Sequence, residues 1–354
     1  MKSLSITTSE HFLNLTSPTD SSEEAHNIGQ SVTADSVRSN IESQLGQLLS
    51  PIVERVADSG GPTDERWYWA APLLLDMEYG GAGVARWFEQ TDLPRVWSGE
   101  KVAGEHDAPD GWARHVELAK QMAQGGEKLG SRPEDLHQVL SAMAIASPGI
   151  VSLRALERIL PDGPSDGVAD IRSSAGPLAH SFLHLFNLPE VMYLLRDRKK
   201  EIPYWQSVLH YCVAGNLQAV MDEFSHILVE SLGLIGSMRS RIAVEVSKAI
   251  SASLTIRTST AKADVITANR RRVRIGEDDA LRMRTRFAMR FGDQDSEDSS
   301  EPTRADHVRS AFNSPFWPFV LATTSVGQEG LDFHPYCHAV VHWNLPSNPV
   351  DLEL

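Results

Sequence analysis

Residues 318–333 read PFVLATTSVGQEGLDF, and this stretch decides the predicted fold of the 354-residue chain. A short apolar run bounded by turn residues is typical of a buried parallel strand, and HAVVHWNLP at 338–346 repeats the pattern. Three hydroxyl residues and two glycines follow the first run: Thr323, Thr324, Ser325, Gly327 and Gly330. Because ligands of an open parallel sheet bind at the carboxyl ends of its strands, these residues predict a phosphate-contacting turn.

The longer segment around this turn resembles part of a motor protein. VLATTSVGQEGLDFHPYCHAVVHWNLPSNPVDLE, at 320–353, is similar to motif V and the following strand in the second RecA-like lobe of superfamily 2 helicases, closest to the Swi2/Snf2 and RapA-like branch. RADHVRSAFNS at 304–314 resembles the helix before this motif. The resemblance implies a fold of class α/β plus α, in which a mostly helical N-terminal region precedes an incomplete RecA-like parallel-sheet lobe.

The resemblance also implies roles for individual residues. The positions that match contacts to the nucleic-acid backbone are Thr323, Thr324 and Ser325. The positions that match the turn coupling this contact to the ATP site, and an acid near the nucleotide ribose, are Gly327, Glu329, Gly330 and Asp332. A turn or cap role is the structural alternative for each of them.

Two departures from the family pattern limit what this chain is expected to do. The sequence contains no Gly-Lys pair, so it lacks the GxxxxGK[ST] loop that cradles the β- and γ-phosphates. It ends NPVDLEL where the family continues into motif VI, whose arginines stabilise the transferred phosphoryl group. We therefore expect a chain truncated before motif VI and not catalytically competent alone. ATP and Mg²⁺ belong to the complete family protein, and we expect neither to bind tightly to this chain.

Arginines upstream of the motif form a second candidate site. The alternating run LRMRTRFAMRF at 281–291 predicts a half-exposed strand, and together with RRRVRI at 270–275 it places eight of the 33 Lys and Arg residues within 21 positions. Arg282, Arg284 and Arg286 are expected to contact a nucleic-acid backbone. The alternative is a solvated strand face that pairs with Glu277, Asp278 and the acidic loop nearby.

From Ser36 to about residue 250 the sequence is helical in pattern. One apolar stripe steps by three and four along Val37, Ile41, Leu45, Leu48, Ile52 and Val56. Similar runs follow, and Gly215-Asn216 is expected to interrupt the longest of them. The predicted organisation is a disordered tail at 1–34, a helical accessory region at 35–255 and the partial helicase lobe at 256–354, with a disordered acidic loop at 293–303.

Composition limits the classes of function. A net charge of −14 disfavours a protein that binds nucleic acid over its whole surface, but it does not exclude a local basic site. Cys212 and Cys337 match no disulfide framework or zinc motif. The sequence shows no signal-peptide pattern and no run of eighteen apolar residues, so we expect a cytoplasmic protein without a membrane partner.

Two other clusters of polar residues are interpreted as structural. His180 and His184 share a helical face, but Ser181 occupies the position at which a zinc peptidase has its catalytic Glu. Asp222 and Glu223 lie within a helical apolar period, whereas a magnesium-binding acid pair of a motor follows a buried strand. No metal site is predicted.

Two functions are therefore consistent with the sequence. The first is the C-terminal part of an ATP-dependent helicase or translocase, whose partners are DNA or RNA and either a missing first RecA-like lobe or a partner protein. The alternative is a non-catalytic helical module that binds proteins and carries a motor remnant. Whether this chain is itself an enzyme, an ATP hydrolase like the family, is left open by the missing motifs.

Overall fold

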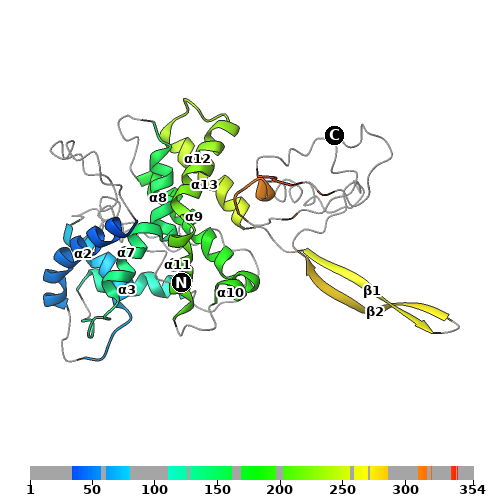
Figure 1. Ribbon diagram of the computed structural model, residues 1–354, viewed down its shortest axis with the longest axis horizontal. Coiled ribbons are helices and arrows are strands. Elements are labelled where there is room, and N and C mark those ends of the chain that lie inside the picture. Colours follow the sequence, from blue (N-terminus) through cyan, green and yellow to red (C-terminus); the bar gives the residue numbers. More distant parts are fainter. Residues whose placement is uncertain are drawn as a thin grey trace. The chain divides into compact units, whose positions relative to one another are not determined.

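The computed structural model describes residues 34–56, 61–79, 111–125, 128–161, 169–196, 202–255, 259–269, 272–285, 310–316, 320, 336–339 and 341. The chain divides into two compact units, Met1–Lys248 and Ala249–Leu354 (Figure 1). The helices are α2 (Ala34–Val56), α3 (Trp67–Tyr79), α6 (Gly111–Ala123), α7 (Leu136–Ala146), α8 (Pro148–Arg158), α9 (Ala169–Phe186), α10 (Pro189–Leu195), α11 (Tyr204–Ala214), α12 (Leu217–Ser231) and α13 (Arg239–Leu254). The strands are β1 (Ser259–Asn269) and β2 (Arg272–Thr285).

Helix α2 has the buried face that its apolar period predicts. Ile41, Leu45, Leu49 and Ile52 are fully buried and recur at steps of four, four and three, which keeps them on one side of the helix. Leu49 takes the buried position expected for Leu48, because repeated steps of four follow the 3.6-residue turn as well as the predicted spacing does. The predicted helix is confirmed, and it continues past the proline inside it to Val56.

Helices α7 and α8 form the centre of the first unit. α7 packs against α2, α3 and α11, while α8 packs against α9 and α12. Together, Leu136–Arg158 is the one described stretch long and apolar enough to cross a membrane. However, 94% of its most apolar window is buried within the protein, so the same apolar character is used here to fill a core.

The break between α7 and α8 is closed by a buried arginine. Ser147 is extended and Pro148 begins α8, which removes the backbone donor that would have continued a single helix. The Arg154 guanidinium donates to the carbonyl oxygens of Ala144 (2.5 Å) and Ile145 (3.2 Å) in the last turn of α7. Burial lowers the pKa of Arg154 to about 10, so the side chain keeps its charge near neutral pH. This positive charge lies at the C-terminal end of α7, where it interacts favourably with the helix dipole.

A loop clasp holds the start of α3 against the segment before α7. Thr63 and Ser131 form an isolated parallel bridge, and the Asp64 amide donates to the Ser131 carbonyl at 2.9 Å. The Asp64 carboxylate accepts hydrogen bonds from the Gly130 amide (3.0 Å) and from the Arg66 side chain (2.9 Å). Burial acts to raise the pKa of Asp64, but these hydrogen bonds outweigh it and hold the pKa below its ordinary value.

Trp67 anchors the same clasp in the core. Its ring is fully buried, and its indole Nε1 donates to the Gly130 carbonyl at 2.9 Å. A Cβ added to Gly130 would lie 2.4 Å from the Pro62 carbonyl oxygen. Only glycine therefore permits this close approach of the two backbones.

The predicted interruption at Gly215-Asn216 is confirmed, since α11 ends at Ala214 and α12 begins at Leu217. Asn216 adopts the left-handed conformation (φ 49°), which asparagine tolerates better than most residues. Gly215 directly follows α11, and Pro148 begins the helix after α7, in keeping with the Gly and Pro stop signals of the sequence.

The prediction of a RecA-like parallel-sheet lobe is wrong. The described strands of the second unit pair antiparallel, from Ser259 opposite Thr285 to Asn269 opposite Arg272 (Figure 1). Parallel strands need a crossover of a dozen residues or more, whereas an antiparallel pair is joined by a short turn. β1 and β2 are separated by only two residues, so closing this hairpin costs less conformational entropy than forming a parallel pair with a long crossover.

The two apolar runs that decided the predicted sheet are not buried at their described positions. Val320 is 80% exposed and Val341 is 85% exposed, and neither belongs to a strand. A central strand is buried only when strands pair on both of its sides and helices cover its faces. An apolar run contains no information about such neighbours, and period alone does not distinguish it from other structures.

Candidate nucleic-acid interface

The hairpin contains two of the three arginines that the sequence analysis selected. Arg282 and Arg284 belong to β2, where their cross-strand partners are Lys262 and Thr260. Arg272 and Arg274, also on β2, lie opposite Asn269 and Thr267. Arg286 lies outside the described residues.

The register opposes two positions of like charge. Lys262 and Arg282 are direct partners in the ladder. Like charges at opposite positions of an antiparallel pair are destabilising. An anion bound to this part of the hairpin would remove that repulsion, and a nucleic-acid backbone supplies anions at regular intervals.

An irregularity in the ladder divides the arginines of β2 into two groups. The register shifts between Ala263 and Val265, so that Leu281 and Gly276 become the successive partners on β2. The residues of β2 passed over by this shift include Glu277 and Asp278, the acids proposed to pair with the arginine face. These acids therefore lie between the two groups of arginines along the strand. The alternating pattern at 281–291 did not predict this bulge, because the residues that the shift passes over, 277–280, precede that pattern.

The candidate site residues of the motor resemblance lie outside the described part of the chain. These are Thr323, Thr324, Ser325, Gly327, Glu329, Gly330 and Asp332. Their expected roles toward nucleic acid and nucleotide stay predictions.

In the first unit, the acid pair on α12 has a structural environment. Asp222 forms an ion pair with Arg158 of α8 and accepts a hydrogen bond from Gln218 at 2.9 Å. Its backbone carbonyl lies 2.7 Å from His226 Nδ1. Within the described residues, no group of three or more His, Cys, Asp and Glu side chains is placed to hold a metal ion.

A polar cluster that sequence reasoning missed joins α3 and α11 to Asp135, the residue that precedes α7. Tyr68 donates to one oxygen of Asp135 at 2.6 Å, and Gln206 donates to the other at 3.3 Å. The Tyr68 ring also packs against Trp205, with centroids 5.1 Å apart. Burial and the neighbouring carboxylate raise the pKa of Tyr68 well above its ordinary range, so the phenol acts as a hydrogen-bond donor that fixes the helices.

A small cavity of about 260 Å³ lies beside this cluster. It is lined by Arg132, Pro133, Glu134, Leu136 and His137. Burial, and then the charge of Arg132, lowers the pKa of His137, which favours its neutral form. A neutral imidazole and one arginine at this edge of α7 do not by themselves define a reaction.

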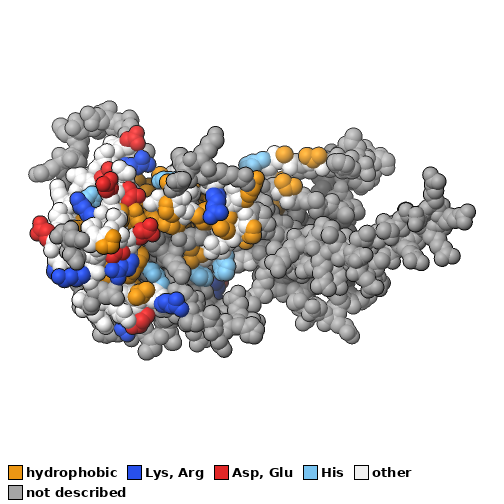
Figure 2. All heavy atoms as spheres, turned by 90° about the horizontal axis from the view of Figure 1, so that it is seen from below, with side chains coloured by type: hydrophobic (Ala, Val, Ile, Leu, Met, Phe, Trp, Pro, Cys, Tyr) orange, Lys and Arg blue, Asp and Glu red, His pale blue; other side chains and the backbone are white. Residues whose placement is uncertain are grey.

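The surface of the first unit exposes large apolar and aromatic side chains. Figure 2 shows hydrophobic side chains interspersed with charged ones on one face of the molecule. Among the described residues of this unit, the exposed large hydrophobic side chains are Tyr79, Leu118, Tyr193, Leu194, Tyr211, Leu232, Ile235 and Met238. Several of them fall into two groups, one on α10 and α11 and the other in the turn between α12 and α13.

Comparisons of the chain with protein-family models, with curated proteins and with solved structures found no match.

Proposed function

We propose that this chain is the nucleic-acid-contacting part of an ATP-dependent helicase or translocase, and that the 354-residue polypeptide does not hydrolyse ATP by itself. The observation that carries the proposal is the run Ala322–Phe333, in which hydroxyls, glycines and acids recur at the spacing of motif V. The proposal rests on this run as a sequence pattern and assigns no parallel sheet to the chain.

The division of chemistry follows from the residues that the sequence contains. Without a Gly-Lys pair, it offers no lysine and backbone cradle for the β- and γ-phosphates of ATP. A second motor segment or a partner protein would supply that cradle and the Mg²⁺. Residues 322–333 would then relay between nucleotide and DNA or RNA, in the cytoplasm.

The hairpin supports the nucleic-acid part of the proposal. The register sets Lys262 opposite Arg282, and a bound polyanion would offset the repulsion between like charges at such positions. Arg and Lys side chains are among the groups that hydrogen-bond to phosphate oxygens in protein–DNA complexes. The chain as a whole is acidic, so a local basic element matters more for binding than the net charge does.

The first test measures binding of fluorescein-labelled single- and double-stranded DNA and RNA by anisotropy, between 50 and 300 mM salt. We expect salt-dependent binding, and the Arg282→Glu/Arg284→Glu double variant should lower the slope of log K against log salt by about 2. Lys128→Glu/Arg241→Glu reverses two exposed charges on the first unit and is the matched control. If neither variant differs from the wild type, or if no binding occurs at 50 mM salt, the proposal fails.

The second test measures phosphate release from ATP with and without saturating DNA or RNA. We expect none above the buffer rate. Turnover that Asp332→Ala abolishes would show that the polypeptide is a complete ATPase and would refute the division of chemistry proposed above.

A second candidate function, a non-catalytic protein-interaction module, is favoured by the turn between α12 and α13. Leu234 anchors this turn, since it is buried and its amide donates to the Val229 carbonyl at 2.9 Å. Gly233 and Gly236 take positive φ angles, and the turn presents Ile235 and its apolar neighbours to solvent. Absence of nucleic-acid binding at any salt concentration, together with loss of a protein complex on Ile235→Asp, would favour this function instead.

A further inference from the structure

Helix α9 carries two histidines, four residues apart, on the side opposite its buried face. The buried hydrophobic residues of α9 are Ala175, Leu178, Ala179, Phe182 and Phe186. His180 and His184 stand two residues before and two residues after Phe182, and a step of two residues turns an α-helix by about 200°. The two imidazoles therefore lie on the outward side of α9, where His180 is half-buried and His184 is exposed.

Packing in the core does not explain why the two rings lie together. The apolar neighbours in the sequence would favour a structural role for the histidines if they shared their face, but Leu178, Phe182 and Phe186 are buried on the other side of the helix. Ser181, between the two histidines, is also buried, and its hydroxyl donates to the Pro177 carbonyl at 3.0 Å. The position of a zinc peptidase's catalytic Glu is thus taken by a group used within the helix, so the pair has no general base beside it.

The geometry of the two rings fits a shared metal ion. Their centroids are 5.2 Å apart and their planes are nearly perpendicular, at 85°. A Zn–N bond to histidine is about 2.0–2.1 Å, so an ion bound to one nitrogen of each ring lies roughly 3 Å from both ring centres. Two rings 5.2 Å apart fit around such an ion with a nearly tetrahedral angle between the bonds. Each ring keeps its second nitrogen for a hydrogen bond, as ligating histidines almost always do.

We infer that His180 and His184 chelate one divalent transition-metal ion of the class that imidazole prefers, such as Zn²⁺, Ni²⁺ or Cu²⁺. Within the described residues no third His, Cys, Asp or Glu side chain is placed to join them, so water occupies the remaining positions. Pro177 lies inside α9 and lacks the N–H that would bond to the preceding turn. An ion that bridges the next two turns would stiffen the helix beyond this gap. The site goes beyond the proposed function and does not depend on it.

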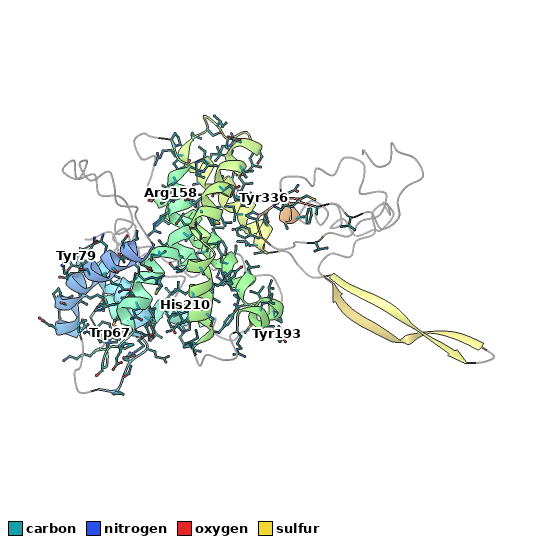
Figure 3. The ribbon with its side chains drawn as sticks, viewed as in Figure 1. Trp67, Tyr79, Arg158, Tyr193, His210 and Tyr336 are labelled. Atoms are coloured by element: carbon teal, nitrogen blue, oxygen red, sulfur yellow. The ribbon has the colours of Figure 1, made fainter. Side chains whose placement is uncertain are left out.

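The test titrates Zn²⁺ into the tag-free full chain and measures the heat of binding by calorimetry, with Mg²⁺ in a parallel titration. The wild type should bind one Zn²⁺ per chain at this site and no Mg²⁺, because Mg²⁺ requires oxygen ligands. His184→Ala should weaken Zn²⁺ binding about a hundredfold, because a single donor does not chelate. His210→Ala removes an exposed histidine of α11 (Figure 3) and is the matched control, which should bind as the wild type does.

A second variant keeps the number of histidines and moves one of them. His184→Leu/Leu185→His exchanges two neighbouring residues, so the two imidazoles stand five residues apart, about 140° around the helix, and no longer share an ion. This variant should lose Zn²⁺ binding to the same extent as His184→Ala. Zn²⁺ should also raise the thermal unfolding midpoint of the wild type and not that of the exchange variant, since an ion bound only to the folded chain stabilises it. Circular dichroism shows whether the variants keep their helices.

Chemical modification locates the ligands directly. Diethyl pyrocarbonate modifies accessible imidazoles, and mass spectrometry of the peptides should show that Zn²⁺ protects His180 and His184 but leaves His210 reactive. Zn²⁺ binding that the exchange variant retains, or protection of other histidines only, would overturn the inference. A stoichiometry of one ion to two chains would also overturn it, because the ion would then be held between copies and not by one chain. If millimolar Zn²⁺ produces no binding heat, the site does not exist, and the proposed nucleic-acid function is unaffected.

Discussion

The first unit is held together by contacts between residues far apart in sequence, whereas the hairpin of the second unit is formed by neighbouring segments. In the first unit, residues far apart in sequence fix one another: Trp67 donates to Gly130, and Tyr68 donates to Asp135. In the hairpin, β1 and β2 are neighbours in sequence and are defined by their register. Contacts between distant residues make the loss of one side chain costly, whereas a two-stranded hairpin is at best marginally stable in water.

This difference also separates the chemistry of the two regions. The polar groups of the loop clasp are used for structure, since the carboxylate of Asp64 is occupied by the backbone and by Arg66. In the hairpin, by contrast, the register sets the basic position Lys262 directly opposite the basic position Arg282, an arrangement that is destabilising. The hairpin is therefore the region whose stability should respond most to an added polyanion.

The largest expected effect is on the core of the first unit. Trp67→Ala should lower the free energy of unfolding by about 3–5 kcal/mol, because it removes a fully buried ring and its hydrogen bond to Gly130. Urea unfolding followed by circular dichroism at 222 nm measures this loss. Trp69→Ala, at a half-buried position that contacts His115, is the control and should cost clearly less. Equal losses would show that burial does not distinguish the two sites.

A pair of glycine variants tests the loop clasp. Gly130→Ala should destabilise the protein by about 1–3 kcal/mol, because the new Cβ meets the Pro62 carbonyl oxygen. Gly46→Ala is the matched control, since a Cβ there meets nothing within 4 Å and the position lies inside α2. That change should stabilise the helix by about 0.5–1 kcal/mol. Thermal unfolding of both variants checks the opposite signs.

Acid should weaken the clasp through Asp64. Its pKa is lower in the folded state than the ordinary value of 3.8, so its contribution to stability is complete above that value and is lost as the pH falls through the folded pKa. Asp64→Asn removes this titration. The wild type should therefore lose more of its advantage over Asp64→Asn between pH 5 and pH 2 than between pH 8 and pH 5, as measured by the midpoint of urea unfolding. A constant difference across this range would contradict the assignment.

The smallest effect is expected in the hairpin. Lys262→Glu turns a repulsive cross-strand pair into an attractive one and should stabilise β1 and β2 by about 0.2–1 kcal/mol. Amide hydrogen exchange of the two strands measures it. The same change should weaken nucleic-acid binding, because it removes a cation from the proposed interface. Faster exchange in the variant would show that Lys262 and Arg282 do not interact across the ladder.

Local pattern was enough to predict most of the helices. The four residues that α2 buries recur at steps of three and four, and the break at Gly215-Asn216 needed only the conformational preferences of two residues. The sequence did not reveal the contacts that connect the helices. Nothing in the spacing of Asp64, Gly130 and Trp67 indicates that they meet, since about 65 residues separate the two loops.

The parallel sheet was mispredicted because the prediction used local runs of sequence, whereas the burial of a strand depends on residues far away in the chain. Val320 and Val341 stand in apolar runs that resemble buried strands, but burial depends on which strands lie beside them. The alternation of arginines did place Arg282 and Arg284 on a strand, and this part of the candidate site was predictable from period two. The exposure of Tyr193 on α10 and Tyr211 on α11 was not predictable, because an aromatic residue in a helical pattern is more often part of a core.

The side chain of Arg154 has a mechanical consequence. It reaches from the second turn of α8 to two carbonyls at the end of α7, so neither helix can slide or pivot without breaking bonds that a charged group makes inside the protein. Helix α7 packs against α2 and α3, and helix α8 packs against α9 and α12. We therefore expect α7 and α8 to move as one rigid pair, so that a displacement of α2 or α3 also displaces α9 and α12.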